Sequence, residues 1–129
     1  MQKFQQVVVV AGKDRKECKQ LCAMLQEADY SATAVHALDH IEVSTREKSA
    51  WAVILDLDSL PIDNHFIKQL FNRNPGICII AISSRSFHPE LKEAFSTCFS
   101  ACLRKPLDSD ELLYWLRSVR RVTDKSGED

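Results

Sequence analysis

Short apolar runs alternate with helical patterns along most of the chain. Five runs are apolar or nearly so, and they are, in order, VVVV from Val7, SATAV from Ser31, WAVIL from Trp51, ICIIAI from Ile77 and SACL from Ser100. Short runs rich in β-branched residues are typical of strands that are buried on both faces of a parallel sheet. The pattern therefore predicts five parallel strands separated by helices.

Helical periodicity fills the intervals between these runs. Apolar residues recur at i, i+3, i+4 and i+7 over Cys18–Leu25 and over Leu112–Val119, which predicts two helices that each bury one face. Asp14 and Asp108 stand at the N-cap positions, each followed three residues later by a glutamate. Shorter helices are expected within residues 39–48, 66–73 and 87–97.

Five strand–helix units in about 120 residues predict a single α/β domain with right-handed crossovers. We expect a flavodoxin-like, doubly wound five-stranded parallel sheet in the order 2-1-3-4-5, with helices on both faces in three layers. With 129 residues and 45% hydrophobic content, the chain can build this core without a metal or a disulfide. The domain is expected over residues 5–122, and the polar tail TDKSGED, residues 123–129, is expected to be disordered.

Charge and hydropathy disfavour two classes of function, nucleic-acid binding and membrane binding. The net charge of −1 provides no basic field that would attract nucleic acid or an anionic membrane surface. The sequence holds no apolar run of the roughly 20 residues that span a bilayer and no apolar signal segment near the N-terminus. We therefore expect a cytoplasmic protein that binds neither nucleic acid nor membranes.

Cysteine and histidine give no strong sign of a metal site. The five cysteines fit a reducing compartment. Their i, i+4 pairs, Cys18 with Cys22 and Cys98 with Cys102, raise a four-thiolate zinc site as an alternative, but packing in the core is the better interpretation. The histidines are expected on the solvated surface, and they are His36, His40, His65 and His88.

In a doubly wound sheet, ligands bind at the carboxyl ends of the strands. The first strand ends at Ala11-Gly12-Lys13-Asp14, which is not a nucleotide phosphate loop. Val7 stands where that loop has its first glycine, and Asp14 stands where it has a magnesium-binding hydroxyl. A flavin phosphate site is disfavoured too, because Asp14 is acidic. The other strand ends carry the groups Asp56, Asp58, Ser83, Ser84 and Lys105.

The segments AVILDLDSLP, IIAISSR and CLRKPLDSDEL, in this order, resemble the receiver domain of two-component response regulators over about residues 7–122. The resemblance implies a non-enzymatic signalling module of a phosphorelay, with a histidine kinase or a downstream effector as partner. It also implies that Asp56 is the phosphoacceptor, that Ser83 and Lys105 contact the phosphoryl group, and that the bond from Lys105 to Pro106 is cis.

One departure from the family pattern bears on chemistry. The acidic pair that holds Mg2+ in receivers falls on Ala11 and Gly12, which carry no carboxylate. Asp56 alone would bind Mg2+ weakly, since this ion requires several oxygen ligands. We therefore predict that Mg2+ binds weakly or not at all and that Lys13 or Lys105 offers its ammonium to Asp56. Asp14 and Asp58 could compensate, but Asp14 is expected to serve as an N-cap, and the direction of Asp58 depends on the loop.

Two alternatives remain open at this stage. Asp56 can be a structural carboxylate paired with a lysine, and the chain can be a small ligand-binding protein or enzyme on the same fold. If it is a signalling module, the last helix offers a binding face for a partner or for a homodimer. Leu113, Tyr114 and Trp115 follow one another around that helix, so some apolar surface is expected to stay outside the core.

Overall fold

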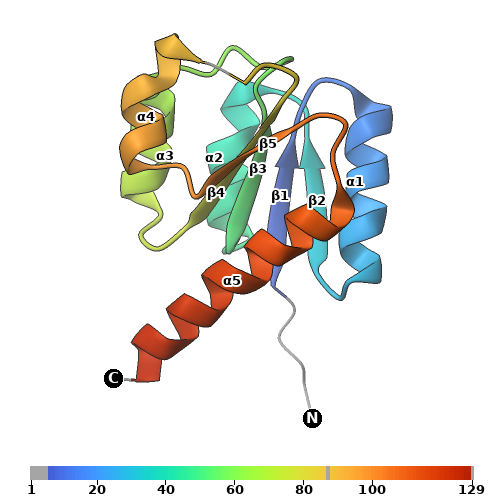
Figure 1. Cartoon of the computed structure of the whole chain (residues 1–129), viewed down its shortest axis with the longest axis vertical. Helices are drawn as coiled ribbons and strands as arrows, with labels where there is room; N and C mark the ends of the chain where they lie inside the picture. The colour runs from blue at the N-terminus through green and yellow to red at the C-terminus, as the bar shows by residue number, and fades with distance from the viewer. Residues whose placement is uncertain (1–5, 87, 129) are drawn as a thin grey trace.

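The computed structural model describes residues 6–86 and 88–128 (Figure 1). Strands and helices alternate along the chain. The elements are β1 (Val7–Ala11), α1 (Arg15–Glu27), β2 (Ser31–Val35), α2 (Leu38–Glu47), β3 (Ala52–Asp56), α3 (Asn64–Arg73), β4 (Cys78–Ser83), the 3-10 turn η1 (Pro89–Leu91), α4 (Lys92–Thr97), β5 (Ala101–Arg104) and α5 (Ser109–Glu128).

The five strands form one parallel sheet in the order β2-β1-β3-β4-β5, which confirms the predicted fold class and strand order. All carboxyl ends therefore lie at one edge of the sheet. The inner strands β1, β3 and β4 are almost entirely buried, whereas β2 and β5 are partly exposed. Their positions at the sheet edges explain why the SATAV and SACL runs are the least apolar of the five.

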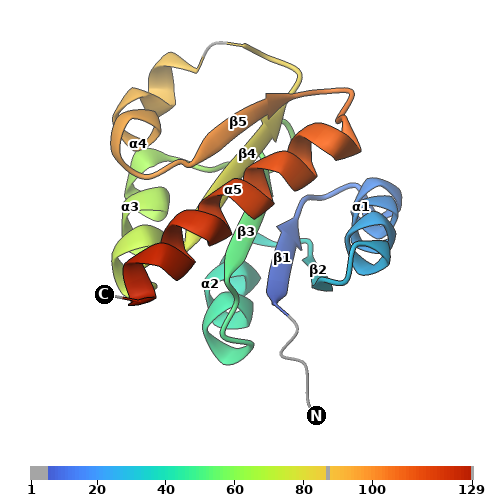
Figure 2. The same cartoon turned by 60° about the horizontal axis from the view of Figure 1, so that its bottom comes forward.

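Alternation along each strand divides the core into two layers. Val8, Val10 and Ile54 pack on the face covered by α1 and α5, with Leu25, Leu112 and Leu116 from those helices. Val9, Val53 and Ile79 pack on the opposite face, with Ile41, Ile67 and Ala94 from α2, α3 and α4. Figure 2 shows α5 crossing in front of the sheet and α2 behind it. We call the layer under α1 and α5 the first cluster and the layer under α2, α3 and α4 the second cluster.

Helix caps agree with the sequence. The Asp14 carboxylate accepts hydrogen bonds from the backbone N of Lys16 and Glu17, at 3.0 and 3.1 Å. Asp108 accepts one from the backbone N of Asp110 at 2.9 Å, where α5 begins. Both predicted N-caps are therefore confirmed. In the same way, Asp63 caps α3, a role that the sequence reading did not assign.

The disorder predicted for residues 123–129 stays a prediction; in the structure, α5 runs from Ser109 to Glu128. Asp129 lies outside the described residues. Once a helix is nucleated, each added residue gains a hydrogen bond, and this segment contains no proline that would stop the helix. A polar composition that cannot build a core can still extend a helix.

Two histidines depart from the expected solvated surface. His88 is buried, with its ring Nε2 3.2 Å from the carbonyl oxygen of Arg85 and its ring beside Phe95. His36 is half-buried, with Nδ1 2.9 Å from the carbonyl oxygen of Gly12. Each ring finds a carbonyl partner, which removes the cost of burying its polar nitrogen. His40 and His65 are exposed as predicted.

The cysteine pairs do not converge. Cys18 packs in the first cluster and Cys98 in the second, so the sheet lies between the two pairs. All five cysteines are free. Within the described residues, no helix is long and apolar enough to cross a membrane.

Candidate functional site

Three of the predicted site residues meet at the carboxyl edge of the sheet. Asp56 is the last residue of β3, Ser83 is the last of β4, and Lys105 directly follows β5. The Lys105 Nζ lies 3.1 Å from Asp56 Oδ1. The backbone N of Lys105 donates to the carbonyl oxygen of Ser83 at 2.9 Å, which extends the β4–β5 pairing. The Lys105–Pro106 bond is cis, as predicted.

The Asp56 carboxylate is buried, and both of its oxygens have partners. Its side chain is 7% exposed. Besides Lys105, Oδ1 accepts a hydrogen bond from the backbone N of Asp58 at 3.0 Å, and Oδ2 accepts one from the Ser59 hydroxyl at 3.0 Å. The carboxylate is therefore compensated by one ion pair and two hydrogen bonds from its own loop, as a buried charge requires.

Asp58 is turned toward the end of β4. The bond from its backbone N to Asp56 closes a tight turn of the Asx kind, and the turn directs its carboxylate at Ser83 and Ser84. Oδ1 accepts from the Ser83 hydroxyl at 2.8 Å, Oδ2 accepts from the backbone N of Ser84 at 2.9 Å, and Lys105 Nζ lies 3.3 Å from Oδ2. The direction that the sequence left open is thus decided by this loop.

The pKa of Asp58 reflects these contacts. Burial of the carboxyl raises its pKa, but the hydrogen bonds from Ser83 and Ser84 and the ammonium of Lys105 outweigh burial and lower the pKa to about 2. Asp58 is therefore ionised throughout the neutral range.

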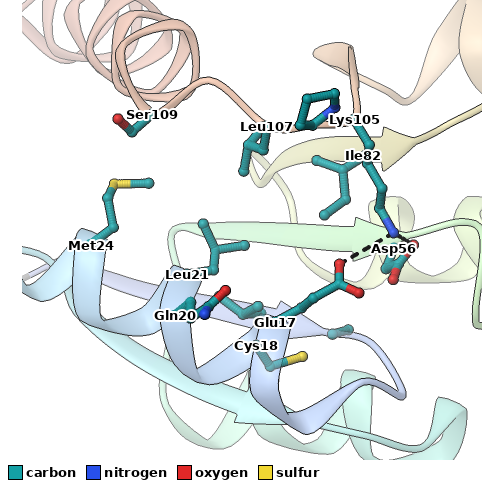
Figure 3. A pocket seen from close by; sticks show the side chains of 13 residues that line it. Glu17, Cys18, Gln20, Leu21, Met24, Asp56, Ile82, Lys105, Leu107 and Ser109 are labelled. Atoms are coloured by element: carbon teal, nitrogen blue, oxygen red, sulfur yellow. Dashed lines mark ion pairs between the residues drawn. The ribbon is translucent and has the colours of Figure 1, made fainter.

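Lys105 is the cationic centre of the site. Its ammonium contacts Asp56, Asp58 and, at 3.5 Å, Glu17 of α1; Figure 3 draws its ion pairs with Asp56 and Glu17. Burial lowers the pKa of Lys105, but its carboxylate partners, led by Asp56, raise this pKa by a larger amount. The net shift of the pKa is therefore upward. One permanent positive charge thus joins α1, the β3–α3 loop and β5.

The end of β1 brings no side-chain oxygen to the site. A Cβ built on Gly12 would lie 3.2 Å from the Asp56 Cβ and 3.5 Å from Asp56 Oδ2, so this position faces the carboxylate directly. Ala11 is buried in the second cluster. The backbone N of Lys13 donates to the Ser59 hydroxyl, and the Lys13 residue is exposed. Of the two lysines considered from the sequence, Lys105 is the one paired with Asp56.

A cleft of about 330 Å³ opens from the Asp56–Lys105 pair along α1. Its walls are largely apolar, with Leu21 and Met24 from α1 opposite Leu107 (Figure 3). Cys18 also lines the cleft; its thiol contacts the Gly12 carbonyl oxygen, and burial raises its pKa to about 11. Cys18 is therefore a protonated thiol and not a nucleophile at neutral pH.

Two site residues were not nominated from the sequence. Ser59 was not considered, and Glu17 was assigned only as a capping residue of α1. A usable signal existed for Ser59, because it follows the strand-end residue Asp56 by three positions. Glu17 carried no such signal, since its approach to Lys105 depends on how α1 packs on β1 and β2 and on where the chain after β5 places the lysine.

Comparisons with known proteins support the fold. Neither a protein-family model nor a curated protein matches the sequence. Solved structures do match. The signal receiver domain of an HD domain-containing protein from Pseudomonas fluorescens has a TM-score of 0.83 at 14% identity, over 95% of this chain and 99% of that one.

Two further structures agree. A CheY-like response regulator receiver domain protein from Methanospirillum hungatei has a TM-score of 0.82 at 10% identity, over 98% of this chain and all of that one. A CheY-like response regulator receiver domain from Methylobacillus flagellatus has a TM-score of 0.73 at 21% identity, over 90% of this chain and 99% of that one. The chain therefore has the fold of response regulator receiver domains.

Proposed function

We propose that the chain is a receiver-like signalling module that acts through protein–protein contacts and is impaired in Mg2+ binding and in phosphorylation of Asp56. The observation that carries the proposal is the Asp56 environment. Asp56 and Ser83 end β3 and β4, and Lys105 directly follows β5, yet Asp56 already has the Lys105 ammonium at 3.1 Å and no carboxylate beside it at the end of β1.

The donor set does not suit Mg2+. This ion prefers octahedral oxygen coordination and gives up its waters reluctantly. Both oxygens of Asp56 are engaged, and Ala11 and Gly12 supply no side-chain oxygen. In the part of the chain that the structure describes, no group of three or more His, Cys, Asp or Glu side chains is arranged to hold a metal. A lysine ammonium supplies charge but not the geometry that a metal gives to an incoming phosphoryl group.

Covalent labelling tests the proposal directly. Incubation with a small acyl phosphate and Mg2+, followed by intact-mass analysis, should give no phosphate adduct on this chain. A receiver with an intact acidic pair, treated in parallel, serves as the positive control. An adduct on the wild-type chain that disappears in Asp56→Asn would contradict the proposal and identify a working receiver.

A small-ligand-binding protein is the second candidate, and the cleft beside α1 is the observation that favours it. Apolar walls that end in a few charged groups are typical of small-molecule sites. Native mass spectrometry of the purified protein separates the two candidates, because a retained small molecule supports only the second.

The proposed contact surface is the outer face of α5. Tyr114 is 64% exposed, whereas Leu113 and Trp115 pack partly against the first cluster. The Tyr114 ring contacts the Trp115 ring edge to face, and most of it remains exposed to solvent. Exposed aromatics of this kind are enriched among the residues that dominate binding energy.

We expect the chain to self-associate through this face or to bind another signalling protein there. Sedimentation velocity at rising concentration should show a dimer for the wild type and at least about tenfold weaker association for Tyr114→Ala. Val43→Ala is the matched control, since Val43 is 43% exposed on α2, on the other side of the sheet. A wild type that stays monomeric rules out the homodimer, and equal effects of both substitutions rule out the Tyr114 face.

A further inference from the structure

Three hydrogen-bond donors at the ends of β4 and β5 converge on one point. They are the Ser83 hydroxyl, the backbone N of Ser84 and the Lys105 ammonium, and all three contact the carboxylate of Asp58, at 2.8, 2.9 and 3.3 Å. A hydroxyl, a backbone N–H and an ammonium that point at a common centre form a cradle for a small oxyanion.

The cradle is ordered by the protein around it. Ser83 is completely buried, and its oxygen accepts a hydrogen bond from the backbone N of Arg85 at 3.0 Å. That acceptor role leaves the hydroxyl proton to be donated to Asp58. Lys105 is held by Asp56 and Glu17 as well as by Asp58. The donors therefore have fixed positions, which favours a ligand of defined size and charge.

Asp58 does not belong to the elements that form the cradle. It comes from the β3–α3 loop, and its direction is set by the bond of its backbone N to Asp56. Its carboxylate is therefore a ligand supplied by a different segment of the same chain. An attached ligand competes at a high effective concentration, and its negative charge also repels an incoming anion.

We propose that the Ser83–Ser84–Lys105 cradle is an oxyanion-binding site whose resident ligand is the chain's own Asp58 carboxylate. This inference rests on the proposed function and deepens it: Asp58 holds the donors that would otherwise face a phosphoryl group on Asp56, and it thereby ties the ends of β3, β4 and β5 together in one arrangement. Removal of the Asp58 carboxylate opens the site to phosphate-sized anions.

Inorganic phosphate and sulfate are the probes. In ¹H–¹⁵N spectra of Asp58→Ala, added phosphate should shift the backbone amide of Ser84 saturably, with affinity at least about tenfold higher than in the wild type. Sulfate should act in the same way, because the cradle recognises charge and shape. The double variant Asp58→Ala with Ser83→Ala should lose the response. Asp39→Ala is the charge-matched control, since Asp39 is exposed on α2, and it should behave as the wild type does.

Two outcomes overturn the proposal: equal phosphate affinity in the wild type and in Asp58→Ala, or a response in Asp58→Ala that survives Ser83→Ala. If Asp58→Ala does not fold, the carboxyl ¹³C titration of the wild type decides. Asp58 should then titrate near pH 2, and Ser83→Ala should raise its pKa. An ordinary pKa for Asp58 near 3.8 contradicts the proposal. None of these readouts involves phosphodonor labelling, so failure here is distinct from failure of the proposed function.

Discussion

Replacing Lys105 with methionine should lower the free energy of unfolding by about 3 kcal/mol. The ammonium lies 3.1 Å from Asp56, whose side chain is only 7% exposed, and 3.3 Å from Asp58. Without it, two neighbouring carboxylates remain with no cation between them. Methionine preserves most of the aliphatic part of the side chain, so the loss in the free energy of unfolding measures the contribution of the charge. Urea denaturation followed by circular dichroism measures the effect.

A surface ion pair provides the control for this prediction. Lys68 and Glu93 are 3.0 Å apart, but each side chain is 60% exposed. Lys68→Met should therefore cost no more than about 0.5 kcal/mol. Combining Lys105→Met with Asp56→Asn should recover about 2 kcal/mol relative to the sum of the single changes, because one of the uncompensated charges is then absent. A cost for Lys105→Met as small as that for Lys68→Met would show that the ammonium does not stabilise the pocket.

Gly12→Asp should create a measurable Mg2+ site. The Cβ at position 12 would lie 3.5 Å from Asp56 Oδ2, so a second carboxylate would stand beside the first. Without metal, their repulsion and the close 3.2 Å approach of the two Cβ atoms should destabilise the variant. Magnesium should reverse this loss, with millimolar affinity in calorimetry and a rise in melting temperature that the wild type does not show.

The controls separate charge from shape. Gly12→Asn has the same size but no charge and should gain no Mg2+ affinity, and Asp56→Asn should abolish the affinity gained by Gly12→Asp. Ala11 is left unchanged because it packs in the second cluster, where a carboxylate would be costly to bury. Saturable Mg2+ binding by the wild type that is lost in Asp56→Asn would contradict the prediction and show that Asp58 or Glu17 replaces the missing pair.

Local sequence determined the architecture of this protein. Continuous β-branched runs such as Val7–Val10 favour strands that are buried on both faces, and the N-cap spacing of Asp14 and Asp108 sets where α1 and α5 begin. These signals act within a few residues, so no knowledge of distant contacts is needed. The positions of Asp56, Ser83 and Lys105 followed from the rule that parallel strands share one carboxyl edge.

Only the tertiary structure decided how these groups are paired. The Asp58 carboxylate meets Ser83 and Ser84, which lie 25 and 26 residues further along the chain. Glu17 reaches Lys105 only after α1 has packed on β1 and β2 and the sheet has formed as far as β5. Each of these contacts joins segments or turns whose relative placement is set by packing, and side-chain pairing across such distances leaves no periodic pattern in the sequence.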